Sequence, residues 1–311
     1  MVEPLGVPQP ASHQTTVLGE GVRWDARHDE LLWVDIVAGR LFRERVDPDG
    51  GLQRVRSYDV GVPLGAVAPV DGEDGYLLAA GRGFARLAPD GALDWLAEPA
   101  PEGTRMNDAA CDPAGRLWAG TLAADHHEGG GALFRLDVDG SVTRVLEGLT
   151  IANGLGWSPD GATLYLNDSG PGVVLAFDFD VEQGTLSGRR ELVRLGGDQG
   201  SPDGLTMDDD GCLWVALYGA GRVHRYTPQG QLDAVVRLPV PQSTCCWFGG
   251  PDLTRLFVTT ATEGYTDEQR AAQPLAGRIF SVPTQVRGTP APAFRPVGPW
   301  WPGGRAAAAA P

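Results

Sequence analysis

The strongest constraint on the fold is a unit that recurs along the 311-residue chain. Three segments align with one another: NDAACDPAGRLWAGTL from Asn107, NGLGWSPDGATLYLND from Asn153 and DGLTMDDDGCLWVALY from Asp203. Each has a short apolar stretch, an acidic or proline-containing turn closed by glycine, and a second apolar stretch. This pattern predicts a strand, a tight turn and a strand. Further alternating segments follow each copy and predict two more strands.

Weaker copies of the unit begin at Glu20, Gly65 and Thr244, which gives six units spaced by roughly 40 to 50 residues. Four antiparallel strands per unit predict an all-β fold, a six-bladed β-propeller. A β-sandwich is the alternative, but a sandwich does not predict a repeated register. The stretch before Glu20, including HQTTVL, is expected to add an outer strand to the last blade and close the ring. The expected parts are an N-terminal extension (1–14), the propeller (15–287) and a Pro- and Ala-rich tail (288–311).

Composition excludes several classes of function. The chain has 25 basic and 40 acidic residues, a net charge of −15, so a nucleic-acid partner is not expected. The four cysteines show no CxxC spacing, which argues against a structural zinc site or a disulfide framework. The sequence shows neither a signal peptide nor an apolar run long enough to cross a bilayer. We therefore expect a cytoplasmic protein without a membrane partner, a monomer or weak homo-oligomer.

Register also predicts a site, because the innermost strand of each blade starts beside the central channel. Four units carry an oxygen-bearing side chain at the same position before their turn: Glu20, Asn107, Asn153 and Asp203. Buried together, two carboxylates and two amides are costly unless a cation joins them. One divalent metal ion is predicted, with Ca²⁺ favoured by ligand type; Mg²⁺ and Mn²⁺ also suit oxygen donors, and open positions would admit Zn²⁺ or Fe²⁺. The alternative is a set of hydrogen-bonded strand ends that cap the blades.

These motifs resemble the SMP-30/gluconolactonase/luciferin-regenerating-enzyme family, from about residue 18 to residue 281. The matching segments are LGEGVRW…LLWVDI, TRMNDAACDPAGRLWAGT, IANGLGWSPDG, SPDGLTMDDDGCLWVALYGAGRVHRY and CCWFGGPDLTRLFVTTA. The resemblance implies a six-bladed propeller with one divalent ion in its channel. By the same resemblance Glu20, Asn153 and Asp203 would bind the ion, and Arg105 and Asn107 would contact the substrate.

The resemblance further implies hydrolysis of a small-molecule sugar lactone, an aldonolactone, to its hydroxy acid. Asp203 is the expected general base, because a carboxylate can hold an ion with one oxygen and accept a proton with the other, which the amide of Asn153 cannot. Arg105 would donate hydrogen bonds to the ring oxygen or hydroxyl groups of the lactone. Asn107 would orient a hydroxyl group or the attacking water.

Two other functions remain open. One is a different hydrolase on the same scaffold, an esterase or phosphotriesterase-like enzyme with a more apolar pocket. The other is a calcium-binding regulatory propeller without catalysis. A serine hydrolase of the α/β type is not supported, because the sequence has no GxSxG motif.

Five further features are open to more than one interpretation. His126–His127 lie in a glycine-rich loop that is either solvated or a lid over the channel mouth. Asp208–Asp210 are expected to form a solvated turn, and Arg82–Gly83 to reach the channel mouth. Cys245–Cys246 are expected in the core or in the pocket lining. Trp300–Trp301 are expected to pack on the propeller wall or on a neighbouring subunit.

Overall fold

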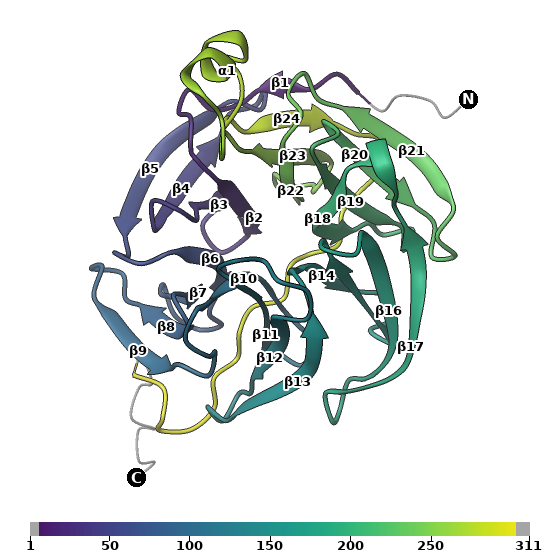
Figure 1. Cartoon of the computed structure of the whole chain (residues 1–311). Coiled ribbons are helices and arrows are strands. Elements are labelled where there is room, and N and C mark those ends of the chain that lie inside the picture. Colours follow the sequence, from purple (N-terminus) through teal and green to yellow (C-terminus); the bar gives the residue numbers. More distant parts are fainter. Residues whose placement is uncertain (1–5, 303–311) are drawn as a thin grey trace.

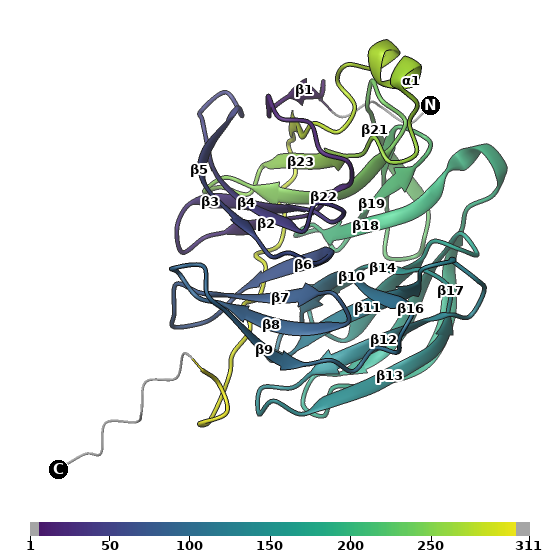
Figure 2. The ribbon, with the colours of Figure 1, turned by 60° about the vertical axis from the view of Figure 1, so that its left-hand side comes forward.

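The computed structural model describes residues 6–302, which form six four-stranded antiparallel sheets arranged around a central channel. Figure 1 looks along the channel, and the sheets radiate from it as blades; Figure 2 shows them obliquely, turned by 60°. This confirms the predicted six-bladed β-propeller. Among the described residues, no helix is long and apolar enough to cross a membrane.

Each of the first five blades consists of four consecutive strands, with the innermost strand first. Blade 1 contains β2 (Gly19–Asp25), β3 (Glu30–Asp35), β4 (Arg40–Val46) and β5 (Leu52–Asp59). Blade 2 contains β6 (Leu64–Pro69), β7 (Tyr76–Ala80), β8 (Gly83–Leu87) and β9 (Leu93–Ala97). Blade 3 contains β10 (Thr104–Cys111), β11 (Leu117–Ala123), β12 (Gly131–Leu136) and β13 (Val142–Leu149).

Blade 4 contains β14 (Ala152–Trp157), β15 (Thr163–Asp168), β16 (Val173–Asp180) and β17 (Thr185–Arg194). Blade 5 follows the short helix η1 (Gly197–Gln199) and contains β18 (Ser201–Met207), β19 (Leu213–Tyr218), β20 (Arg222–Tyr226) and β21 (Leu232–Arg237). Blade 6 contains β22 (Ser243–Gly249), β23 (Arg255–Thr260), β24 (Phe280–Pro283) and β1 (Gln9–Pro10). Helix α1 (Asp267–Ala272) lies between β23 and β24.

The stretch before Glu20 adds the outer strand of the last blade as expected, although this strand lies upstream of the HQTTVL segment. The outer strand of blade 6 is β1, in which Gln9 pairs with Ser281 of β24. The HQTTVL segment lies downstream of this strand. Its amides at Val17 and Leu18 donate to the carboxylate of Asp35, and Leu18 forms only a single antiparallel bridge, with Ala261 after β23.

Every blade has a register shift between its two innermost strands. The shifts fall between Glu20 and Arg23, Leu64 and Ala66, Met106 and Ala109, Ala152 and Leu155, Pro202 and Leu205, and Ser243 and Cys246. A β-bulge changes the direction of the side chains that it contains. The six bulges therefore lie at the positions that the repeat register assigned to the channel.

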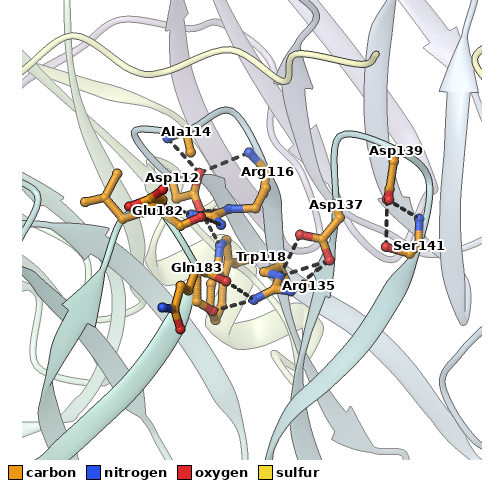
Figure 3. Close-up of polar contacts among 12 residues, drawn as sticks. Asp112, Ala114, Arg116, Trp118, Arg135, Asp137, Asp139, Ser141, Glu182 and Gln183 are labelled. Carbon is orange, nitrogen blue, oxygen red and sulfur yellow. Dashed lines mark hydrogen bonds and ion pairs between the residues drawn. The ribbon is translucent and has the colours of Figure 1, made fainter. Parts of the chain in front are cut away.

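The turn after the innermost strand of blade 3 is tied to its own blade and to the next. In blade 3 the carboxylate of Asp112 accepts hydrogen bonds from Trp118 Nε1 (2.9 Å) and from the backbone amides of Ala114 and Arg116 (Figure 3). The guanidinium of Arg116 donates to Asp112 and also to the carbonyl oxygen of Val181 in blade 4. A buried carboxylate with several donors thus fixes both the turn and the contact between blades.

Blade 5 repeats this arrangement at Asp208, which corrects the expectation of a solvated turn. Asp208 is fully buried and accepts hydrogen bonds from Cys212 N (2.9 Å), Trp214 Nε1 (2.8 Å) and Arg225 Nε (2.7 Å). Its charge is therefore neutralised by an arginine. The other two carboxylates of the turn are more exposed and also pair with arginines.

The C-terminal residues 286–302, which we call the strap, run back across the propeller (Figure 1). Backbone bridges join Gly288 to Asp208 in blade 5 and Phe294 to Val70 in blade 2. Phe294 is fully buried, Trp301 is 4% exposed, and Trp300 Nε1 donates to the carbonyl oxygen of Val138. The paired tryptophans therefore pack on the propeller of their own chain.

Candidate active site

A cavity of about 320 Å³ lies at the channel end where the innermost strands begin. Its wall includes the four side chains that share one position in the repeat register, together with Arg105 of β10. The four are Glu20, Asn107, Asn153 and Asp203, and each is only 5–6% exposed. The structure thus brings all five sequence-predicted site residues to one cavity from blades 1, 3, 4 and 5.

Hydrogen bonds fix the orientation of Arg105 and Asn107. Arg105 Nη1 donates to Asn107 Oδ1 at 2.8 Å. Asn107 Nδ2 in turn donates to the carbonyl oxygen of Ala152 at 3.1 Å, which anchors the amide to blade 4. Burial lowers the pKa of Arg105, while the carboxylates of Glu263, Glu20 and Asp203 act in the opposite direction. These carboxylates favour the charged form of the guanidinium. Arg105 therefore supplies a positively charged side chain at a fixed place in the cavity wall.

A second network joins blades 4 and 5. Asn153 Nδ2 donates to Asp203 Oδ1 and to Ser169 Oγ, and Ser169 Oγ donates to the carbonyl oxygen of Pro202 at 2.6 Å. Asn167 Nδ2 donates to the backbone oxygen of Asp203 at 2.6 Å. Both the side chain and the backbone of Asp203 are therefore held by blade 4, which limits its movement in the cavity.

The two carboxylates of the cavity share an unfavourable environment. Burial raises the pKa of Glu20 to about 8, and the nearby carboxylate of Asp108 adds to this effect. Burial also raises the pKa of Asp203 well above its usual range, with the charge of Glu20 as the next cause. Two buried carboxylates at one site are stabilised by a bound proton or by a cation. The pair is thus prepared to accept positive charge.

The donor set fits a hard divalent cation. Within residues 6–302, no group of three His, Cys, Asp or Glu side chains could hold a metal ion, so three protein ligands here need a further kind of oxygen donor, such as an amide. Glu20 and Asp203 supply carboxylate oxygens. Asn153 supplies Oδ1 once its amide is turned by half a rotation, which gives up its hydrogen bond to Asp203. Three oxygen donors with open positions suit Ca²⁺ or Mg²⁺ by ligand type.

The cavity also contains residues that the sequence did not single out. Ser169, Ser201, Tyr218 and Glu263 line it. Ser169, Ser201 and Glu263 lie in or next to connecting segments, and Tyr218 is the last residue of β19. None of these positions repeats from blade to blade, so the register argument carries no signal for them.

Three residue pairs with open interpretations have definite places. His126 lines the cavity, and its backbone has a φ of 56°, whereas His127 is exposed and contacts Asp125. Arg82 forms an ion pair with Glu98 at 3.0 Å and is not among the residues that line the cavity. Cys245 and Cys246 are both buried in the hydrophobic core.

Comparison with known proteins assigns the family. The family model described as SMP-30/Gluconolactonase/LRE-like region matches residues 18–262. The chain belongs to the SMP-30/gluconolactonase/LRE-like family. This confirms the resemblance seen in its motifs, and the matched range includes all five residues of the cavity that the sequence predicted.

Relatives in the SMP-30/gluconolactonase/LRE-like family are similar over nearly the whole chain. Regucalcin of Xenopus laevis is 38% identical over 279 residues, which cover 86% of this chain and 91% of that protein. The 6-deoxy-6-sulfogluconolactonase of Pseudomonas putida is 36% identical over 286 residues, covering 90% and 96%. A crystal structure described as a calcium-binding protein, regucalcin, from Agrobacterium tumefaciens has a TM-score of 0.87 at 28% identity, covering 95% and 99%.

Proposed function

We propose that this protein hydrolyses a sugar lactone to its hydroxy acid with the help of one divalent cation. The observation that carries the proposal is the cavity that gathers Glu20, Asn153 and Asp203 beside Arg105 and Asn107. The name of the Pseudomonas putida relative, a gluconolactonase, supports the reaction class. The Agrobacterium tumefaciens structure, described as calcium-binding, supports the choice of Ca²⁺.

Glu20, Asn153 and Asp203 would hold the cation. Bound there, a divalent ion supplies Lewis acidity, which polarises a lactone carbonyl and stabilises negative charge that develops on its oxygen. Positive charge in the cavity also stabilises the ionised form of both carboxylates.

Asp203 acts as the general base in this proposal. Its ionised carboxylate accepts a proton from the water that attacks the lactone carbonyl, and the hydrogen bond from Asn167 Nδ2 to the backbone oxygen of Asp203 keeps this residue in place. The amides of Asn107 and Asn153 cannot take a proton. Glu20 carries the second negative charge that the cation requires.

Arg105 and Asn107 bind and orient the substrate. The guanidinium donates hydrogen bonds to the ring oxygen or the hydroxyl groups of the lactone. Because Asn107 is itself anchored to Ala152, it presents a fixed amide to the substrate and to the attacking water. Holding both reactants in this way lowers the entropic part of the barrier.

The test is pH-stat hydrolysis of a panel of aldonolactones, with and without a chelator, together with elemental analysis of the purified protein. Asp203→Asn should lower kcat by about 10² to 10⁴-fold, the usual range for loss of a general base. Asp209→Asn, in the turn at the other end of the channel, is the matched control and should keep full activity. Undiminished activity after the metal has been removed with a chelator would contradict the role of the cation.

A second candidate is favoured by the apolar part of the same cavity. Leu18, Ile36, Leu122 and Ile151 line it, which suits an ester with a less polar ring than a sugar. Aryl esters and phosphotriesters in the same panel distinguish this hydrolase from a sugar lactonase. A protein that binds calcium but cleaves none of these compounds would be a calcium-binding propeller without catalysis.

A further inference from the structure

Glu263 is an acidic residue of the candidate active-site cavity that the proposed mechanism does not use. It follows β23 in blade 6, whereas Arg105 belongs to β10 in blade 3. In a ring of six consecutive blades these two blades lie opposite each other (Figure 1). A substrate in the cavity therefore has an acidic residue on one side and a basic residue on the other.

The backbone around Glu263 is fixed, whereas its carboxylate is not tied to the protein. The amide of Thr262 donates to the carbonyl oxygen of Val17 at 2.8 Å. The backbone oxygen of Glu263 accepts a hydrogen bond from Gln242 Nε2 at 3.1 Å. Within residues 6–302 the carboxylate itself forms no ion pair or hydrogen bond, and the residue is exposed. The fold thus holds Glu263 at the cavity without using its charge in a structural contact.

The negative charge of Glu263 acts on other side chains of the same cavity. Burial lowers the pKa of Arg105, and Glu263 has the largest effect among the carboxylates that oppose this. Burial raises the pKa of Tyr218, which also lines the cavity, to about 12, and Glu263 is the charge that adds most to this rise. Because the interaction between charges weakens with distance and is screened by water, both effects place the carboxylate near the space that a substrate would occupy.

The charges of the cavity balance only when Glu263 is included. The ionised side chains of the wall are one guanidinium and three carboxylates, those of Arg105, Glu20, Asp203 and Glu263. In the proposed function a divalent cation compensates Glu20 and Asp203, which leaves Glu263 to compensate Arg105. Without Glu263 the cavity would carry an excess positive charge and would attract anions.

Two other ionisable groups near the cavity do not change this balance. Arg23 and Asp108 form an ion pair with each other at 3.0 Å, which is neutral as a whole. His126 also lines the cavity, and a histidine carries charge only when it is protonated.

We propose that Glu263 determines the substrate specificity of this site: it compensates the charge of Arg105 and thereby favours uncharged lactones over lactones that carry a carboxylate, sulfonate or phosphate group. An anionic substituent meets the like charge of Glu263 and gains little from a guanidinium that is already compensated. A lactone with only hydroxyl substituents loses nothing, because a hydroxyl group can donate to the carboxylate or accept from the guanidinium. The inference rests on the proposed lactonase function and names the substrate class of that site.

The experiment compares two lactones with the same ring. Gluconolactone is uncharged, and 6-deoxy-6-sulfogluconolactone carries a sulfonate that stays ionised throughout the working range of pH. Hydrolysis by the whole chain with calcium is measured at about pH 7.5, where an unperturbed histidine is mostly uncharged. We expect kcat/KM for gluconolactone to exceed that for the sulfonated lactone by about tenfold or more. High salt should reduce this preference, because it screens the charge of Glu263.

Three substitutions test whether Glu263 causes the preference. Glu263→Gln removes the charge and keeps the shape, so it should raise kcat/KM for the sulfonated lactone by about fivefold or more and change that for gluconolactone by less than about twofold. Glu263→Asp keeps the charge and should keep the preference. Glu268→Gln is the matched control, because Glu268 is exposed in helix α1 and does not line the cavity, and it should change neither value. Thermal melting verifies that all three variants are folded.

Binding without turnover separates this inference from the proposed reaction. Calorimetry uses the two corresponding lactams, in which an amide replaces the ester that would be hydrolysed. We expect the wild type to bind the uncharged lactam more tightly than the sulfonated one, and Glu263→Gln to reduce the difference by about fivefold or more.

The two assays together give distinct outcomes. A protein that cleaves gluconolactone but shows the same preference in Glu263→Gln would overturn the role of Glu263 and leave the proposed function intact. A protein that cleaves neither lactone but distinguishes the two lactams through Glu263 would contradict the proposed hydrolysis and support the role of Glu263. Equal use of both compounds by the wild type, or neither binding nor cleavage of any of them, would reject the inference.

Discussion

Glu20 is a residue whose burial makes stability depend on pH. Its pKa is raised from 4.5 to about 8 by burial, with Asp108 as a further cause and Arg105 opposing, and the pKa of Asp203 is also raised. The folded state therefore holds a proton that the unfolded chain releases. This contribution is present in full below the unfolded pKa and is lost as the pH rises through the folded pKa.

We expect the melting temperature of the chelated protein to fall between about pH 5 and pH 8. Saturating Ca²⁺ should reduce this slope, since the cation takes the place of the protons. Without calcium, Glu20→Gln should also make the melting temperature depend less steeply on pH. A chelated wild type that gains stability over the same range would show that the carboxylates are ionised in the folded state without a cation.

Asp208 illustrates a residue whose role is structural although its neighbours suggest an ion site. Asp208→Ala removes the acceptor of Trp214 and Arg225 and leaves a partly buried guanidinium with less compensation. We expect a loss of about 3–5 kcal/mol in the free energy of unfolding, measured with urea. Asp209→Ala, in the same turn, should change it by less than about 0.5 kcal/mol. Equal losses would contradict the assignment.

Register explains why some site residues could be predicted and others could not. Asn107, Asn153 and Asp203 recur at one position before a glycine turn, so the repeat that predicts the blades also predicts the side chains facing the channel. Glu263 and Ser169 reach the cavity from positions without such a repeat. The burial of Asp208 depends on Trp214 and Arg225, which lie on other strands. The run of three aspartates in the sequence does not indicate that one of them is buried.

At the scale of elements, the strap is held both by its aromatic side chains and by backbone hydrogen bonds to the propeller, such as Phe294 N to the carbonyl oxygen of Pro69. Phe294 is fully buried and packs near Trp300 and Trp301. Phe294→Ala should lower the free energy of unfolding by about 3–5 kcal/mol, as for other buried aromatic residues. Val297→Ala, at an exposed position of the same segment, should have almost no effect. Urea unfolding of both variants tests this, and a small loss for Phe294→Ala would mean that the strap binds through its backbone.

The packing of this segment was beyond the reach of sequence reasoning. Its Pro and Ala content has no helical or strand periodicity, so only the cost of exposing Trp300 and Trp301 indicated a contact. The blades, in contrast, carry local alternation and turn glycines in every copy. Closure by β1 was predicted in principle, but the short QP strand has no pattern of its own that could locate it.

For the whole molecule, β1 is the element that joins the two ends of the ring. Deleting residues 1–12 removes β1 and exposes the edge of β24. We expect a lower melting temperature and association that grows with protein concentration, because an unpaired edge strand pairs with other chains. Deleting residues 1–5, which stops short of β1, is the control. Light scattering and thermal melting measure both effects, and a monomeric, unchanged 1–12 deletion would contradict the role of β1.

The pairing of β1 with β24 also has a consequence for biosynthesis. Gln9 and Pro10 leave the ribosome long before their partners Phe280 and Ser281, because the five intervening blades are translated between them. Individual blades can form as they emerge, since their strands are consecutive in the chain. The final pairing has to await the synthesis of β24, and until then the nascent chain is an open arc with two unprotected edges that chaperones can recognise.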